Sequence, residues 1–209
     1  MRVKSTELDN VLEIVPPTNF EDFRGSYIEL YNERVYCEAG ISQEFIQDDI
    51  SMSRRNVLRG IHGDQTTTKL VTCLHGAFYL VVVNNDPTSQ QYRKWQGFTL
   101  SAERPTQILI PPKFGNGHLV LSSMAIFHYK QNTYYNQKGQ FTYVWNDPKL
   151  DIWRKLEFTT TGFNFETLTG DEATKLVLEM HIGNKCIEYE TQNEPIYTPR
   201  LMYCVSFIK

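Results

Sequence analysis

Long hydrophobic runs, a large net charge and a cysteine framework are all missing from this sequence of 209 residues. No run approaches the roughly 18 apolar residues of a membrane-spanning helix, and the N-terminal segment MRVKSTELDN has no apolar stretch of the signal-peptide kind. A net charge of −3 creates no field that would favour nucleic acid or an anionic membrane. We therefore expect a cytoplasmic protein that binds neither.

Cysteines are few and scattered. Cys37, Cys73, Cys186 and Cys204 follow no CxxC spacing and are too sparse for a disulfide framework, so we expect reduced thiols. Apolar residues make up 41% of the chain and charged residues 22%, which is ordinary for a globular protein of one domain. The aromatic content of 13% and the many β-branched residues favour sheet over helix.

Short segments of alternating polarity dominate the first two-thirds of the chain. They recur about every 8–12 residues between turns rich in glycine, proline and asparagine, as in antiparallel sandwiches and barrels. The expected strands cover 11–15, 26–31, 45–51, 69–74, 77–83, 92–100, 106–110, 118–122 and 124–130. Turns are expected at 20–25 and 111–117, and a short helix within 32–40. The pattern predicts a mainly β fold, a jelly-roll barrel with N-terminal strands over residues 1–153.

The character of the chain changes after residue 153. Residues 169–172, TGDE, have the form of a capping box, and apolar residues follow at helical spacing. We expect a short helix over about 170–182 and two further strands, which together form a C-terminal extension, residues 154–209, packed on the barrel.

One stretch combines several side chains that could do chemistry. Residues 56–64, NVLRGIHGD, place Arg59 and His62 among glycines, and Lys69 follows soon after. Histidine suits proton abstraction near neutral pH, so His62 is the candidate base, and the glycines would let backbone or ligand approach closely. Tyr129 is the candidate acid, facing His62 across the barrel. The alternative interpretation is a core tyrosine with its hydroxyl at the rim.

Several longer segments form a recognisable series over roughly residues 10–153. They are FEDFRGSYIE (20–29), FIQDDIS (45–51), NVLRGIH (56–62), KLVTCLHG (69–76), LSAERPTQILIPPKFGNGH (100–118), YK (129–130) and WNDPKLDI (145–152). In their order and spacing the chain resembles the dTDP-4-dehydrorhamnose 3,5-epimerase family of cofactor-free cupins. The segments RGIHGD, TTTKL, FGNGH and FTYVWND look more like those of the branch that acts on GDP-linked 4-keto-6-deoxy heptoses in bacterial capsule biosynthesis.

The resemblance implies a role for each matching residue. His62 would remove the proton alpha to the ketone, Tyr129 would deliver a proton to the opposite face, and Lys69 would stabilise the enolate at the C4 oxygen. Arg59 would contact the diphosphate, and Arg24 would reach the nucleotide of the neighbouring subunit in a homodimer. The remaining substrate-lining positions are Glu29, Gln47, Asp49 and Asn116. Neither metal nor another cofactor is implied.

The chain departs from the family pattern in ways that matter to the base. Family members hold the histidine with an aspartate that follows a Trp-Pro pair. Here Trp153 precedes an arginine, and Asp171 is the nearest candidate partner.

Strand parity puts Arg59 and His62 on opposite faces unless a bulge near Gly60 corrects it. Gly63 and Asn116 replace an aromatic residue and a histidine, and we expect the lost volume to admit a larger sugar.

Metal and covalent chemistry fit the residues less well. Metal-binding cupins use an H-x-H pair, but His62 is followed by Gly63 and Asp64, and His118 alone makes no metal site. Cys73 and Ser51 have no evident base nearby in sequence. We expect an epimerase that inverts C3, C5 or both in a nucleotide-linked 4-keto-6-deoxy sugar. The alternatives are a 3,4-ketoisomerase of the same class, a non-catalytic nucleotide-sugar-binding cupin and a metal-dependent cupin.

Overall fold

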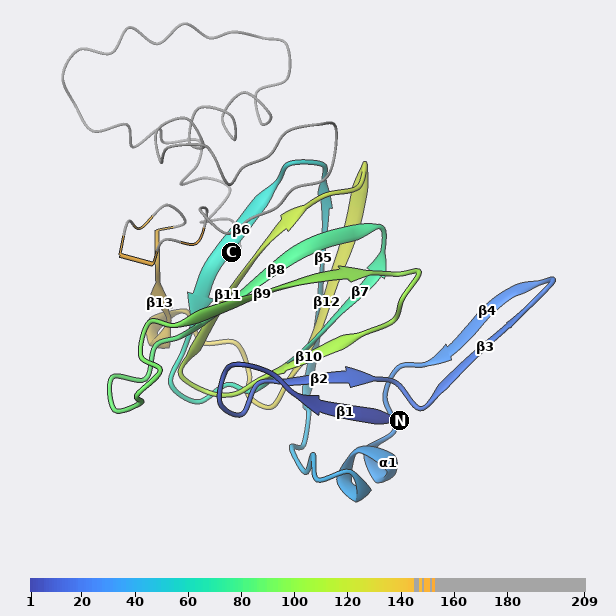
Figure 1. Cartoon of the computed structure of the whole chain (residues 1–209), viewed down its shortest axis with the longest axis horizontal. Helices are drawn as coiled ribbons and strands as arrows, with labels where there is room; N and C mark the ends of the chain where they lie inside the picture. The colour runs from blue at the N-terminus through green and yellow to red at the C-terminus, as the bar shows by residue number, and fades with distance from the viewer. Residues whose placement is uncertain (145–146, 148, 151, 153–209) are drawn as a thin grey trace, which may run out of the picture.

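Two antiparallel sheets face each other in the computed structural model, which describes residues 1–144, 147, 149–150 and 152 (Figure 1). The elements are β1 (Arg2–Ser5), β2 (Leu12–Val15), β3 (Thr18–Asp22), β4 (Gly25–Glu29), α1 (Glu33–Glu38), β5 (Gln47–Arg54), β6 (Leu58–Gly63), β7 (Lys69–His75), β8 (Ala77–Asn84), β9 (Trp95–Ser101), β10 (Gln107–Ile110), β11 (Phe114–Val120), β12 (Met124–Gln131), the 3₁₀ turn η1 (Gln137–Gly139) and β13 (Phe141–Thr142). The expected mainly β fold is confirmed.

The core lies between a six-stranded sheet, in the order β1-β2-β10-β7-β12-β5, and a five-stranded sheet, in the order β13-β6-β11-β8-β9. Alternation builds it, because every second residue of a strand points to the same face. In β12, Ala125 and Phe127 are buried between the sheets, and Tyr129 packs against the same cluster, as the sequence predicts. Phe78, Leu80 and other residues of β8 close the core from the opposite sheet.

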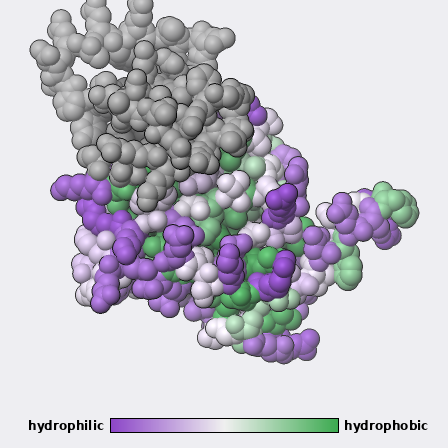
Figure 2. Space-filling view, in the orientation of Figure 1, coloured by the Kyte–Doolittle hydropathy of each residue, from purple (hydrophilic) through white to green (hydrophobic). Residues whose placement is uncertain are grey.

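The hairpin of β3 and β4 stands away from both sheets (Figure 1). Its first strand includes Phe20, so the turn expected over 20–25 is shorter and begins at Asp22. That carboxylate accepts from the backbone N–H of Arg24 at 2.8 Å, and Gly25 supplies a φ of +119°. Hydrophobic side chains mark the hairpin tip in Figure 2, where Phe23 is 98% exposed.

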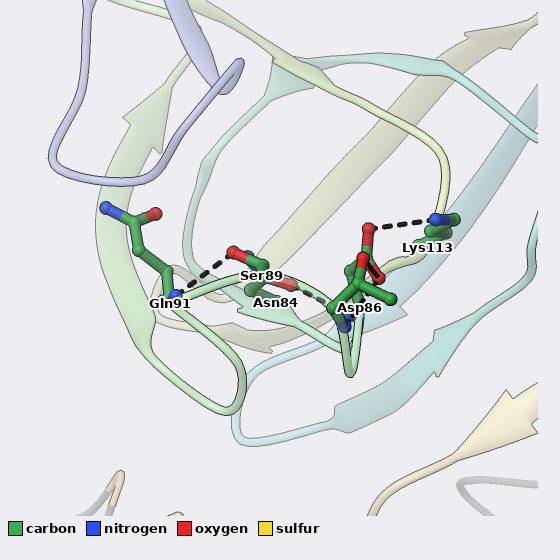
Figure 3. A network of polar contacts seen from close by, with 6 residues as sticks. Asn84, Asp86, Ser89, Gln91 and Lys113 are labelled. Carbon is green, nitrogen blue, oxygen red and sulfur yellow. Dashed lines mark hydrogen bonds and ion pairs between the residues drawn. The ribbon is translucent and has the colours of Figure 1, made fainter.

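Strand β11 corrects the largest error of the sequence-based assignment. We predicted a break over 111–117, but the strand begins at Phe114, directly after Lys113. A polar network holds this entry point (Figure 3). The Lys113 ammonium donates to Asp86 at 2.8 Å, and the backbone N–H of Asp86 donates to Asn84 at 2.8 Å. The bond from Lys113 lowers the pKa of Asp86 to about 2. This network ties the loop after β8 to the start of β11.

The remaining predictions concern the short helix, the cysteines and the C-terminal extension. The expected short helix is confirmed as α1, and Asn32 caps it by accepting from the backbone N–H of Val35 at 3.3 Å. Cys37 and Cys73 are free thiols. The helix expected over 170–182, the rest of the extension and the other two cysteines lie outside the described residues. Within the described chain, no helix combines the length and apolar character needed to cross a membrane.

Candidate active site

Polar side chains from both sheets meet inside the jelly roll. His62 of β6 and Asn116 of β11 are direct partners in the five-stranded sheet. Lys69 of β7 and Tyr129 of β12 belong to the six-stranded sheet. The Lys69 ammonium joins the two walls, because it donates to Asn116 Oδ1 at 3.3 Å and lies 5.5 Å from the centre of the Tyr129 ring. The structure therefore brings the expected base, acid and cation into one cluster.

A β-bulge at Gly60 turns the base toward this cluster. Two residues separate Arg59 from His62 in β6, but only one separates their partners in β11. The extra residue puts Arg59 and His62 on the same face, which simple alternation would not do. Gly60 has a φ of +101°, and an added Cβ would lie 2.5 Å from the Gly117 Cα, so only glycine fits. The bulge that the sequence required is confirmed.

His62 is half-buried and lies between two polar neighbours. On one side, β11 presents Asn116. On the other, β13 presents Thr142, whose Oγ1 lies 3.0 Å from Nδ1 of His62. Thr142 was not among the residues predicted for the site, although it lies in the FTYVWND segment that carries part of the family resemblance.

Opposing effects act on the cation of the cluster. Burial lowers the pKa of Lys69, and the negative charges of Asp64 and Asp49 act in the other direction. Burial also raises the pKa of Asp64, but hydrogen bonds from Thr67 and Thr66 outweigh it, so that carboxyl titrates below its ordinary range. The two carboxylates therefore favour the charged form of this partly buried lysine, and a preorganised cation stabilises an oxyanion.

Tyr129 lies beside a carboxylate on the neighbouring strand. Asp49 of β5 is its direct cross-strand partner, so the negative charge of Asp49 acts on the phenol. Gln47 fixes that carboxylate by donating to Oδ2 of Asp49 at 2.7 Å, while its own oxygen accepts from the backbone N–H of Tyr135 at 3.1 Å. Burial raises the pKa of Tyr129, and the charge of Asp49 raises it further. The phenol is thus kept protonated, the form that can deliver a proton.

Arg59 links the cluster to the packed core. Its Nε donates to Ser53 Oγ at 2.9 Å. His118, the partner of Arg59 in β11, is 4% exposed and stacks on Phe127 at a centroid distance of 4.2 Å. In the part of the chain that the structure describes, no three His, Cys, Asp or Glu side chains group as metal ligands. His118 therefore belongs to the aromatic core.

Comparison with known proteins identifies the family that this chain matches. The sequence profile of the dTDP-4-dehydrorhamnose 3,5-epimerase family matches residues 5–173. The Escherichia coli K12 enzyme of that name is 40% identical over 156 residues, which are 73% of this chain and 84% of that protein. The chain belongs to the dTDP-4-dehydrorhamnose 3,5-epimerase family. It is thus an enzyme of the isomerase class.

Solved structures confirm the fold of this epimerase. The dTDP-4-dehydrorhamnose 3,5-epimerase of Elizabethkingia anophelis is 38% identical with a TM-score of 0.68, covering 75% of this chain and 87% of that one. A Legionella pneumophila 3,5-epimerase in complex with dTDP-4-keto-L-rhamnose is 33% identical with a TM-score of 0.69, covering 83% and 90%. The expected cupin-type jelly roll is confirmed. The family match extends past residues 10–153 at both ends and includes Asp171, which lies outside the described residues.

Two expected substrate contacts of the epimerase are not part of the cluster around His62. Arg24 lies at the hairpin tip, where its side chain is 76% exposed and pairs with Asp22 at 2.7 Å. Glu29, at the end of β4, accepts from Asn32 at 3.1 Å.

The space expected at Gly63 is not available to a sugar. An added Cβ would lie 2.3 Å from the backbone oxygen of Phe114 and 2.6 Å from the ring of Phe141. The lost side-chain volume is therefore filled by another part of the epimerase chain. Of the two positions expected to enlarge the site, only Asn116 faces the cluster, and its carboxamide is bonded to Lys69.

Proposed function

We propose that this enzyme epimerises a nucleotide-linked 4-keto-6-deoxy sugar at C3, C5 or both, by removing and returning protons through an enolate. The observation that carries the proposal is the placement of His62 and Tyr129 on opposing sheets, with Lys69 joined to both walls between them. Inversion of a carbon requires proton loss on one face and proton gain on the other. Groups on opposing walls can serve the two faces of one planar enolate.

The residue types fit each step of this chemistry. The C4 ketone acidifies the C–H bonds at C3 and C5. His62 takes the proton from one of these carbons, and the electron pair of the broken C–H bond moves into the enolate. Charge then develops on the C4 oxygen, where the Lys69 ammonium would stabilise it. Tyr129 gives its phenolic proton to the opposite face, and exchange with solvent restores both groups. This sequence of steps uses protein side chains alone and proceeds without a change of oxidation state.

The nucleotide and the sugar are the finer part of the proposal. Relatives carry the name dTDP-4-dehydrorhamnose 3,5-epimerase, which supports a dTDP-linked 4-keto-6-deoxy sugar as the first substrate to try. The segments RGIHGD and FGNGH instead favour a GDP-linked heptose, with Asn116 leaving room for the extra carbon. The ratio of kcat/KM for heptose and hexose decides between them, and Asn116→His should lower it. Equal ratios in wild type and variant would remove the heptose assignment.

We also propose that the enzyme acts as a homodimer. The hairpin exposes Phe23 and Arg24 at its tip, and an exposed apolar ring beside an arginine suits insertion into a second copy, where Arg24 would exchange Asp22 for a bound diphosphate. Light scattering should give twice the chain mass. An equimolar mixture of His62→Asn and Arg24→Ala should recover activity, because a mixed dimer contains one intact site. A monomer mass, or no recovery on mixing, would contradict this assembly.

Deuterium exchange tests the chemistry directly. Wild type and His62→Asn are incubated in D2O with dTDP- and GDP-linked 4-keto-6-deoxy sugars, and deuterium is located by NMR. We expect label at C3, C5 or both, at a rate at least about 100-fold lower in the variant. His75→Asn, which changes an exposed histidine of β7, is the matched control.

The same experiment separates the alternatives. Tight binding without label by wild type would indicate a nucleotide-sugar-binding cupin. Movement of the ketone from C4 to C3 would indicate a 3,4-ketoisomerase, and loss of exchange on chelation, restored by metal, would indicate a metal-dependent cupin.

A further inference from the structure

A short segment, 141–143, is fastened to the strand that carries the base. Phe141 and Thr142 form β13 and pair with Gly63 and His62 of β6. The next residue extends the contact, because the backbone N–H of Tyr143 donates to the carbonyl of Ile61 at 3.0 Å. The segment therefore follows β6 through the residues on either side of His62.

Two glycines create the surface on which Phe141 packs. A Cβ added at Gly63 would lie 2.6 Å from the Phe141 ring, and one added at Gly115 would lie 3.2 Å from it. The ring thus covers the backbone of β6 and β11 at these two positions. A larger residue at either glycine would keep the ring away from the backbone. Aromatic side chains stabilise strand glycines in this way by covering them across the pair. The Tyr143 ring also meets the Phe141 ring edge-on, at a centroid distance of 5.9 Å. The register of β13 on β6 is therefore set by packing as well as by backbone bonds.

This register determines what His62 meets. Residues directly opposite each other in an antiparallel pair have side chains on the same face. Thr142 is opposite His62, and its Oγ1 lies 3.0 Å from Nδ1. With the hydrogen on Nδ1, the imidazole donates to this hydroxyl and keeps the Nε2 lone pair for a base. After Nε2 takes a proton, Nδ1 still donates, so the contact holds in both states.

We propose that Thr142 is a positioning residue that selects the Nδ1–H tautomer of His62 and aims Nε2 at the substrate, with the Phe141 ring on Gly63 and Gly115 fixing its register. The inference rests on the proposed function, in which His62 is the base. It assigns to a hydroxyl in the barrel a task that the sequence analysis gave to Asp171.

Matched threonine variants test the proposal in the full chain. Thr142→Val keeps the shape and β-propensity but removes the hydroxyl, and Thr142→Ser keeps the hydroxyl. Thr99→Val makes the same change at an exposed threonine of β9. We expect deuterium incorporation to fall about fivefold in Thr142→Val, the value of one ordinary hydrogen bond, and to stay near wild type in the other two.

A spectroscopic measurement keeps this test separate from the activity. In protein with ¹⁵N-labelled histidine, the His62 signals are those missing from His62→Asn. They should report the Nδ1–H tautomer in wild type and Thr142→Ser, and a shift toward Nε2–H in Thr142→Val. An unchanged tautomer and rate in Thr142→Val, with both altered in Asp171→Asn, would overturn the proposal. A tautomer change without deuterium exchange in wild type would instead retain the contact and reject the epimerase function.

Discussion

Two neighbouring regions of the barrel interior, the candidate active site and the aromatic core, are built from the same two strands, β11 and β12, but have different roles. In β11, Asn116 belongs to the candidate active site, whereas His118, two residues further along the strand, belongs to the core. In β12, Tyr129 and Phe127 divide in the same way. A step of two residues keeps the face and changes only the depth. The position of a residue along the strand therefore decides whether its side chain lies in the candidate site or in the packed core.

The two histidines sharpen this contrast. His62 is half-buried beside a hydroxyl, whereas His118 is 4% exposed and stacks almost parallel to Phe127, with an interplanar angle of 8°. Burial, together with the charge of Arg59, lowers the pKa of His118 to about 3. His118 therefore stays neutral at physiological pH and acts as an aromatic core residue. The surroundings decide the role, because the side chain is the same.

Removing the cation of the candidate active site should have the largest effect. We expect Lys69→Met to lower the rate of proton exchange by about 100- to 1,000-fold, the range found when an oxyanion loses a preorganised donor. The side chain keeps its length, so the barrel should still fold. Lys130→Met is the control, since that lysine lies in the same sheet but pairs with Asp48 on β5 at 2.8 Å. Equal losses in both variants would show that Lys69 acts through folding rather than through the enolate.

A smaller effect should follow from Asp49→Asn. The carboxylate raises the pKa of both Tyr129 and Lys69, so its removal lowers both, whichever group limits activity at high pH. The alkaline limb of the pH profile of kcat/KM should therefore move to lower pH. The loss of the negative charge beside the phenol and the ammonium should also cost about tenfold in rate.

Asp48→Asn is a close control for this prediction. Asp48 is the preceding residue in β5, and its carboxylate accepts from Lys130. Its profile should match wild type. An alkaline limb that stays in place in Asp49→Asn would show that neither Tyr129 nor Lys69 controls the rate there.

Much of this division could be predicted from local pattern. Tyr129 shares parity with Phe127, so the alternation of period two placed both in the interior. The same rule exposed a conflict between Arg59 and His62, and it correctly demanded the bulge at Gly60.

What the sequence could not supply were contacts between distant segments. The run around Phe114 looked like a loop because it is rich in glycine, but those glycines allow β11 to lie close against β6. Thr142 is 80 residues from His62, and no local spacing predicts that pair. The expected link between His62 and Asp171 stays a prediction.

The core region should tolerate a change that the active-site region would not. His118→Phe keeps an aromatic ring on Phe127 and removes Nε2, which has no hydrogen-bond partner among the described residues. Proton exchange should continue at the wild-type rate. The free energy of unfolding at pH 7 should rise by about 1 kcal/mol, because an unsatisfied buried polar atom is removed. His75→Phe, at an exposed histidine of the same barrel, should bring no such gain.

Acid should widen this difference, because the pKa of buried His118 is lowered to about 3 while an unfolded chain titrates near 6.5. Between these values the unfolded state binds a proton that the folded state does not, so wild type loses stability as the pH falls. At pH 5 the added loss is about 2 kcal/mol, and His118→Phe should escape it. Urea unfolding at pH 7 and pH 5 measures both terms. A constant difference between the two proteins would mean that His118 titrates normally, and the contrast between the two histidines would then fail.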